Sequence, residues 1–333
     1  MKQSADLKRL LTSIDHKSYP AYKDVRGAYD FNTYILSIDH VQGDPFASPS
    51  KVNIQVRHAK AGFPAELFDT PWKKTALEDY LLRCFSREIG RLSFKAKGSG
   101  KSGLISTSRP GPEVMRRTAV EFTEKLLIVR FEVGFPANGR TINAQELEKI
   151  LLDFLPQIVK KCLYYQAWDK RLVQEGFELA ENQQKIREVL EERKLVAFCA
   201  NGSILPRKSG VSSQPLKDAV AFESPKSMEL AIDLPFGGSI FGMGIPEGVT
   251  LIIGGGYHGK STLLQALEQG VYNHVKGDGR EYVITRVNAL KLRAEDGRAV
   301  SNLDLSLFIH DLPNGKDTHC FSTEDASGST SQA

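Results

Sequence analysis

The sequence predicts an α/β protein of two parts: a smaller α+β domain over residues 1–165, then a second α/β domain over residues 166–333. Three observations lead to this. The first part contains several strand-length runs of apolar residues between helical stretches. A charge-rich helical stretch, Asp169 to Lys194, begins the second part and connects it to the first. The second part holds an apolar run, a glycine-rich turn and a helix-forming run in succession, from Val249 to Leu267.

Composition is that of a globular protein that works in a reducing compartment. The chain has 333 residues, of which 41% are hydrophobic and 25% charged, enough for two ordinary domains. A net charge of only +4 means that any nucleic-acid surface must be a local patch. The four cysteines are scattered, which argues against a zinc site or a disulfide framework. No run is long enough to span a membrane, and no signal peptide is visible, so we expect a cytoplasmic protein.

The first part is predicted to mix helices and strands. Ser4 to Asp15 has apolar residues at helical spacing, and Thr70 to Ile89 begins with a capping threonine and a proline that suits the first helical position. A third helix follows, in which Pro156 is expected to cause a break or a kink. The strands are expected at 31–41, 52–57 and 126–135, and the third helix at 143–165.

Between Arg91 and Arg130 the charge balance becomes strongly basic. Nine lysines and arginines face three glutamates, a local charge of +6. Such a stretch can neutralise phosphates without reading bases, so it is a candidate contact for RNA or another polyanion. A solvated loop is the alternative. The candidate residues are Lys95, Lys97, Lys101, Arg109, Arg116 and Arg117.

The second part is organised around a phosphate-binding motif. The apolar run Val249 to Ile253 is expected to be a strand, and a helix is expected to begin near Lys260. Between them the pattern G-x-x-x-x-G-K-S predicts a P-loop, in which backbone N–H groups surround phosphate oxygens. Lys260 would reach the β- and γ-phosphates of ATP, and the Ser261 hydroxyl would ligate Mg²⁺. The motif comprises Gly254, Gly255, Gly256, Tyr257, His258, Gly259, Lys260, Ser261 and Thr262.

The alternative to the P-loop prediction is a chance glycine-rich turn. Two residues inside the motif are also unusual. Tyr257 and His258 are bulky for such a loop, and His258 is expected to face outward rather than to act in catalysis. Strands are expected at 195–200, 228–234 and 281–285. A strand group ahead of the P-loop, in place of a helix, favours an antiparallel sheet of the kind found in an ABC-type core. The helix 169–194 is expected to show an exposed, salt-bridged face.

The C-terminal segment carries a second candidate for phosphate contact. Small hydroxyl residues surround Ser327, Gly328 and Ser329, and such a loop offers N–H and O–H donors to a γ-phosphate. A polar tail without fixed structure is the alternative reading of the same composition.

Several segments together resemble the family of soluble predicted ATPases of the ABC class. The likeness covers most of the chain. It is carried by GGGYHGKSTLL (254–264), GVYNHVKGDGRE (270–281), RAEDGR (293–298), FSTEDASGSTSQA (321–333), HVQGDPFASP (40–49) and FPANGR (135–140). The resemblance implies a P-loop NTPase of ABC type preceded by a smaller α+β N-terminal domain. It also implies a head-to-tail homodimer in which the loop at Ser327 to Ser329 closes over the partner's ATP. Family members have been linked to RNA.

The sequence departs from the family pattern at one place. An ABC ATPase needs a Walker B strand that ends in Asp and Glu and follows the signature loop, and none is present, so the chain resembles a truncated copy with impaired hydrolysis. We reject the run Leu307 to Asp311 as a substitute because it precedes the loop and lacks the second acid. Glu295 is a weak candidate for the family's γ-phosphate sensor, and an ordinary turn acid is preferred. Phe236, Phe241 and Tyr257 remain open as partners for adenine.

Three functions are therefore compatible with the sequence. The preferred one is an ATP-binding ABC-class ATPase that uses ATP and Mg²⁺, forms homodimers and is coupled to RNA. The second is a P-loop phosphotransferase, which would need an arginine-rich lid drawn from Arg280, Arg286, Arg293 and Arg298. The third is a nucleic-acid-binding module in which the P-loop only senses nucleotide.

Overall fold

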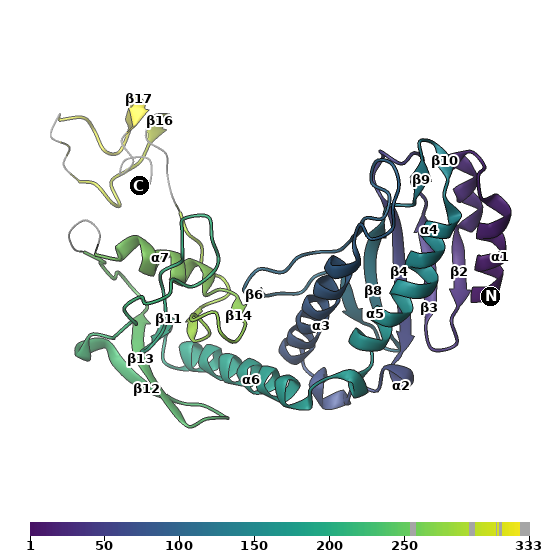
Figure 1. The fold of residues 1–333 in the computed structure, drawn as a ribbon. Coiled ribbons are helices and arrows are strands. Elements are labelled where there is room, and N and C mark those ends of the chain that lie inside the picture. Colours follow the sequence, from purple (N-terminus) through teal and green to yellow (C-terminus); the bar gives the residue numbers. More distant parts are fainter. Residues whose placement is uncertain (254–257, 293–296, 311, 313–314, 327–333) are drawn as a thin grey trace. The chain divides into compact units, whose positions relative to one another are not determined.

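The computed structural model describes residues 1–253, 258–292, 297–310, 312 and 315–326 (Figure 1). The chain divides into two compact units, Met1–Val287 and Asn288–Ala333. Within the described ranges no helix is both long enough and apolar enough to cross a membrane. Mixed helices and sheets confirm the predicted α/β class.

A largely antiparallel sheet dominates the N-terminal half of the first unit. Its order is β1-β2-β3-β4-β8-β5, with β7 also paired to β8, and only the β1–β2 pair is parallel. The register of β4 against β8 is unbroken from Ser50 opposite Val133 to Arg57 opposite Leu126. The strands are β1 Lys2–Gln3, β2 Gly27–Asp30, β3 Ile35–His40, β4 Ser50–Arg57, β5 Ile105–Ser106, β7 Val120–Phe122 and β8 Leu126–Val133.

Alternation along β8 explains how this sheet forms a core. Leu127, Val129, Phe131 and Val133 are buried, whereas the residues between them are half-buried or exposed. Side chains of one parity along a strand share a face. Figure 1 draws α3, α4 and α5 in front of these strands. The helices of this half are α1 Ser4–Ile14, α2 His58–Ala61, α3 Pro71–Leu92, α4 Ala144–Glu148 and α5 Leu155–Cys162, with a π-helical segment Lys149–Phe154.

The strand expected at 31–41 begins later than predicted. Phe31 N–H donates to the Tyr34 carbonyl at 2.9 Å, and Asn32 has a φ of 64°. Asparagine tolerates this left-handed conformation better than most residues. A turn therefore occupies 31–34 and joins β2 to β3 as a hairpin, which the apolar pattern alone did not reveal.

The helices follow the sequence more closely, with two differences. The Thr70 hydroxyl makes no capping bond and is buried without a partner among the described residues, so α3 depends on Pro71 at its start. Pro156 does not break the helix expected at 143–165, although the helix ends at Cys162. Because proline lacks an N–H, the preceding turn widens into the π-helical segment, and α5 continues through it.

The second half of the first unit contains a long helix and a four-stranded antiparallel sheet. The helix α6 spans Lys170–Glu192, and the Asp169 side chain caps it by accepting from Arg171 N–H at 2.9 Å. The sheet has the order β12-β13-β11-β15, which confirms the expected antiparallel group. Its strands are β11 Leu195–Ala200, β12 Glu229–Asp233, β13 Ser239–Pro246 and β15 Val283–Thr285, and α7 Lys260–Gln269 follows β13 in the chain.

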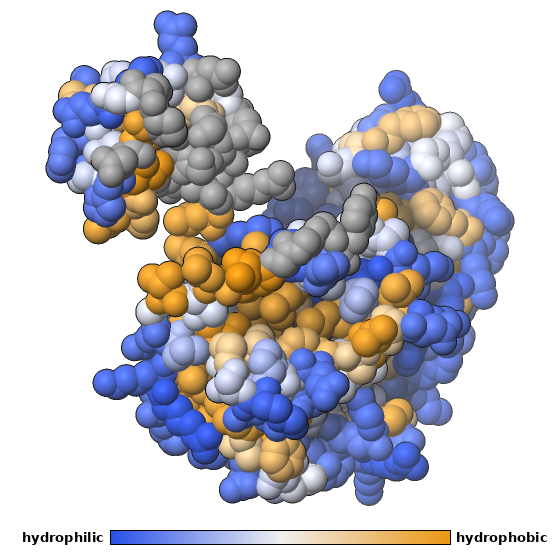
Figure 2. Space-filling model, turned by 90° about the vertical axis from the view of Figure 1, so that its left-hand side faces the viewer, coloured by the Kyte–Doolittle hydropathy of each residue, from blue (hydrophilic) through white to orange (hydrophobic). Residues whose placement is uncertain are grey.

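The apolar run Val249 to Ile253 is not a strand, contrary to the sequence prediction. These residues have no regular structure, and the side chains of Val249 and Ile253 are 93% and 84% exposed. Figure 2, viewed from the side on which Figure 1 draws α7 and β12, shows apolar side chains gathered on this face. A strand forms only where a neighbouring strand supplies backbone hydrogen bonds, and no described residue pairs with this run.

Three short two-stranded sheets complete the described structure. β9 Ala137–Asn138 pairs with β10 Thr141–Ile142, and β14 Asn273–His274 pairs with β6 Glu113–Val114, all antiparallel. In the second unit β16 Arg298–Leu303 pairs with β17 Phe321–Ala326. Residues 307–309 form no strand there. The candidate loop Ser327 to Ser329 and Glu295 lie outside the described residues.

Candidate nucleotide site

The described part of the P-loop is its C-terminal half. Gly254 to Tyr257 lie outside the described residues, and the structure resumes at His258, which is exposed as expected. Gly259 has φ 80° and ψ 4°, the left-handed conformation, and immediately precedes α7. A side chain on this residue would cost about 1–2 kcal/mol from backbone strain alone. Glycine is therefore favoured here by its backbone conformation and not by crowding, since no atom of the described residues lies within 4 Å of an added Cβ.

The N-terminus of α7 has the features of an anion-binding helix end. The first helical hydrogen bond runs from Leu263 N–H to the Gly259 carbonyl at 2.9 Å, so the N–H groups of 260–262 precede the helical ladder. No acidic residue lies in the first turn. The positive end of the helix dipole is thus not neutralised by its own side chains and can receive an anion. Ser261 is exposed at this end, and Lys260 is half-buried.

The opposite end of α7 is fixed against β15 by close backbone contact. Thr285 N–H donates to the Gly270 carbonyl at 2.8 Å, and the Thr285 hydroxyl donates to the Leu267 carbonyl at 2.7 Å. A Cβ added to Gly270 would lie 2.8 Å from the Val283 carbonyl oxygen. The helix is therefore held at its C-terminus by contacts that tolerate only glycine.

A buried polar cluster extends this anchor. The Asp278 carboxylate contacts His274 Nδ1 at 2.7 Å and an Arg207 guanidinium nitrogen at 2.7 Å. Arg280 is fully buried, and it donates to the Leu205 carbonyl and, at 2.6 Å, to the Gln269 side chain. Burial lowers the pKa of Arg280 to about 10, and the neighbouring charge of Arg207 acts in the same direction.

The long helix α6 also contacts the segments that hold the C-terminus of α7, so it is not merely an exposed, salt-bridged surface. Arg187 donates to the Thr285 carbonyl at 2.8 Å and to the Val271 carbonyl at 3.1 Å. Gln183 donates from its amide to the carbonyls of His274 and Glu281, both at 2.9 Å. Burial lowers the pKa of Arg187 to about 10. The charge pattern correctly predicted that glutamates of this helix are exposed. It wrongly predicted that Arg187 belongs to the same exposed, salt-bridged face.

Sequence reasoning missed the roles of His274, Asp278 and Arg280. A signal was present, because charged residues alternate with Gly277 and Gly279 there, and both glycines adopt positive φ. The structure also bears on the arginines considered for a kinase lid. Arg280 is buried, and Arg286 pairs with Glu247. These two side chains are engaged within the fold and are not arranged as a lid.

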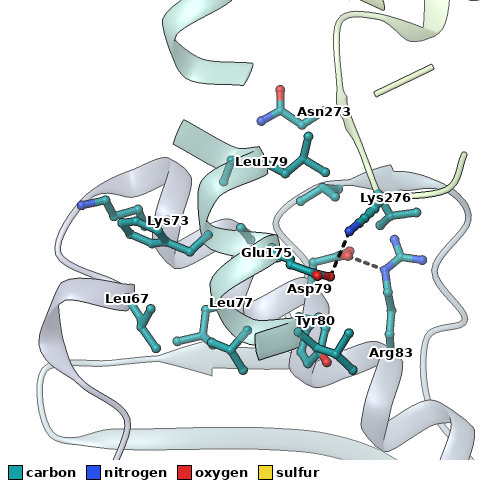
Figure 3. A pocket seen from close by; sticks show the side chains of 18 of the residues that line it. Leu67, Lys73, Leu77, Asp79, Tyr80, Arg83, Glu175, Leu179, Asn273 and Lys276 are labelled. Atoms are coloured by element: carbon teal, nitrogen blue, oxygen red, sulfur yellow. Dashed lines mark hydrogen bonds and ion pairs between the residues drawn. The ribbon is translucent and has the colours of Figure 1, made fainter. Parts of the chain in front are cut away.

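A separate hollow of about 360 Å³ lies among α3, α6 and the segment after β14 (Figure 3). Its lining is mainly apolar. The cations at its rim are already paired, with Lys276 contacting Glu175 at 3.0 Å and Arg83 contacting Asp79 at 2.6 Å. A phosphate-binding pocket requires cations that can turn toward the ligand. This hollow therefore lacks the chemistry of a nucleotide-phosphate site.

The candidate basic residues between Arg91 and Arg130 differ in their exposure and in their contacts. Arg117 pairs with the buried Asp79 and also donates to the Glu113 carbonyl, so it serves the fold. The remaining candidates are exposed or half-buried, namely Lys95, Lys97, Lys101, Arg109 and Arg116. Their loop is packed, since Ser102 is buried and donates to the Ser99 carbonyl at 2.5 Å.

Of the aromatic candidates for adenine, two are described. Phe241 is 54% exposed. Phe236 is half-buried, its ring lies edge-on to Phe177 at 6.1 Å, and its N–H donates to Asn182 at 3.0 Å. Phe236 is thus part of the packing around α6. Of the two described rings, Phe241 is therefore the more accessible to an adenine. Tyr257 lies outside the described residues.

Comparison with known proteins agrees with this architecture. The N-terminal domain model of the ATPases of the ABC class matches residues 4–166, and the P-loop domain model of the same ATPases matches residues 169–333. The chain is also similar to Uncharacterized protein MJ1628 of Methanocaldococcus jannaschii, with 36% identity over 142 residues. That match covers 40% of this chain and about a third (32%) of the relative. The chain belongs to the family of ABC-class ATPases, with both the N-terminal and the P-loop domain of that family.

Proposed function

We propose that this protein binds Mg-ATP through residues 254–262 and acts as an ABC-class ATPase. The observation that carries the proposal is the left-handed Gly259 leading into α7, a helix with no acid in its first turn, in a segment that reads G-K-S-T. Lys260 would contact the β- and γ-phosphates, and the helix N-terminus would stabilise their charge.

The residues present fit a magnesium ion at this position. Mg²⁺ prefers oxygen ligands and is usually shared between a protein hydroxyl or carboxylate and the nucleotide phosphates. The Ser261 hydroxyl is exposed at the start of α7. When bound, the ion would neutralise phosphate charge. The role of Ser261 is to orient it beside the site that Lys260 defines.

We further propose that two chains pair head to tail, with Ser327 to Ser329 of one chain contacting the nucleotide of the other. The support is the family membership and the small hydroxyl residues of that segment. Sedimentation of the chain with and without Mg-ATP tests this, and a nucleotide-dependent dimer is expected. Association unchanged by nucleotide would contradict the pairing.

Calorimetry tests the binding proposal. Lys260→Ala should abolish detectable Mg-ATP binding, because it removes the one cation of the motif. Lys276→Ala is the matched control: its ammonium is exposed and pairs with Glu175 outside the motif, so its affinity should equal that of the parent protein. Circular dichroism verifies that both variants are folded. An unchanged affinity in Lys260→Ala would overturn the assignment.

A coupling to RNA is supported by the exposed cations of the segment 91–130. Replacing Lys95, Lys97 and Lys101 by glutamine should weaken single-stranded RNA binding for every sequence tested. The slope of log affinity against log salt should flatten by roughly 2. Arg117→Gln is not a suitable probe, because it would break the ion pair with Asp79. Binding that does not change with salt would contradict the coupling.

A further inference from the structure

Two cysteines far apart in the sequence meet between helices α3 and α5. Cys84 lies in α3, and Cys162 is the last residue of α5, 78 positions later. Their Sγ atoms are 3.1 Å apart. A disulfide needs about 2.05 Å between the sulfurs, so an approach of about 1 Å would allow a bond. Both are free thiols in the structure.

The two sulfurs differ in access and in charge. Cys84 is half-buried, and an Arg87 guanidinium nitrogen lies 3.9 Å from its Sγ, whereas Cys162 is fully buried. The hydrogen bond with Cys162 lowers the pKa of Cys84 to about 7, against the effect of burial and with help from the Arg87 charge. The same hydrogen bond and burial raise the pKa of Cys162. Cys84 is thus the more accessible and the more acidic thiol of the pair.

The surroundings of Cys84 are cationic. Glu88, the one acid next to it in α3, is shared by Arg91 at 2.7 Å and Lys161 at 3.1 Å. Arg87 contacts Glu88 only at 3.9 Å and also lines a shallow surface hollow. Reactive cysteines characteristically occupy such partly exposed, electropositive places.

We propose that Cys84 and Cys162 form a redox-active dithiol that is oxidised by hydrogen peroxide. The Cys84 thiolate attacks one peroxide oxygen. An S–O bond forms, the O–O bond breaks, and the departing hydroxide takes up a proton to become water. The Cys162 sulfur then attacks the Cys84 sulfur as its own proton is released. An S–S bond forms, the S–O bond breaks, and a second water leaves. The peroxide is reduced by two electrons, and the two thiols are oxidised.

The other cysteines lack this arrangement. Cys199 is buried, and burial raises its pKa to about 12, which keeps the thiol protonated. Cys320 is exposed, and its Sγ lies 3.6 Å from the Asn302 side-chain oxygen. Transient, redox-sensing disulfides are the kind expected of proteins in a reducing compartment. Cys320 therefore serves as an internal control for simple exposure.

A bond between these cysteines would join two parts of the N-terminal half. The end of α5 is already held by Trp168, whose indole N–H donates to the Cys162 carbonyl at 2.9 Å. Trp168 and Tyr80, one turn before Cys84, both line the apolar hollow of Figure 3. Oxidation would therefore reduce the freedom of α3 relative to α5 beside that hollow.

Peptide mapping of the full-length chain tests the proposal. The protein is treated with a few equivalents of hydrogen peroxide, free thiols are alkylated, and the digest is analysed by mass spectrometry. The expected product is a cross-linked peptide pair that contains Cys84 and Cys162 and separates on reduction. In Cys162→Ser, dimedone should label Cys84 as its sulfenic acid. In Cys84→Ser the cross-link should be absent.

Two controls sharpen the result. Cys320→Ser should retain the cross-link in full. Arg87→Met should slow alkylation of Cys84 near neutral pH by roughly two- to fivefold, because the thiolate loses its nearest cation. The proposal is overturned if Cys84 and Cys162 are both fully alkylated after peroxide treatment. It is also overturned if Cys84 pairs with Cys320 in place of Cys162.

Discussion

Removing the charge of Asp278 should destabilise the first unit strongly without affecting nucleotide binding. The carboxylate is buried, and one of its oxygens contacts Arg207 and His274, each at 2.7 Å. The Arg207 side chain is itself only 6% exposed. The replacement Asp278→Asn keeps the shape of the side chain but leaves the guanidinium without its counter-charge.

The expected loss is about 3 kcal/mol of unfolding free energy. Breaking a buried pair by removing one partner costs about 3–5 kcal/mol. The lower end applies because Arg207 still donates to the Asp278 backbone carbonyl at 2.7 Å. Arg207→Met tests the origin of the loss. If the ion pair is responsible, the double variant should be less destabilised than the sum of the singles by about 1–3 kcal/mol.

Urea unfolding followed by circular dichroism measures this loss, and calorimetry measures Mg-ATP affinity below the unfolding transition. Ten residues of α7 place about 15 Å between the cluster and the helix N-terminus. The affinity should therefore change less than threefold. A stability change below 1 kcal/mol would refute the argument from burial. A tenfold loss of affinity in folded protein would show that the cluster belongs to the nucleotide site.

Three further outcomes follow from the same structure. Gly270→Ala should cost about 1–3 kcal/mol in urea unfolding, because the new Cβ meets a carbonyl oxygen. Gly90→Ala, on the uncrowded last turn of α3, should stabilise by up to ~1 kcal/mol. Arg187→Met should destabilise by about 2–3 kcal/mol, since it removes charge-assisted bonds to backbone carbonyls, and hydrogen exchange around 270–285 should rise. Hydrogen bonds from Ser224 first, then from Asn201 and Lys226, lower the pKa of Glu229 from 4.5 to about 2. The stabilising effect of the Glu229 carboxylate is therefore present above about pH 4.5 and is lost as the pH falls toward 2. The stabilities of the parent protein and of Glu229→Gln should differ at about pH 6 and converge near pH 2. An acid titration followed by circular dichroism checks this.

Local sequence signals predicted the elements whose causes are local. The helix α6 was located to within two residues from its charge-rich composition, and in the structure the Asp169 side chain caps it. The strand β8 was found because its run of apolar residues has the length and composition of a strand. The helix start after Gly259 was predicted because the glycine and the following helix formers are adjacent in the chain.

Properties that depend on a partner distant in the sequence were decided only by the tertiary structure. The run Val249 to Ile253 has the composition of a buried strand, but a strand also needs a neighbouring backbone, and no described residue supplies one. In the sequence Arg280 resembles a surface cation, but in the structure its guanidinium donates to the Leu205 carbonyl and to the Gln269 side chain. Cys84 and Cys162 became a pair because α3 packs against α5. Spacing along the chain carries no information about which helices meet, since side-chain packing between elements sets those contacts.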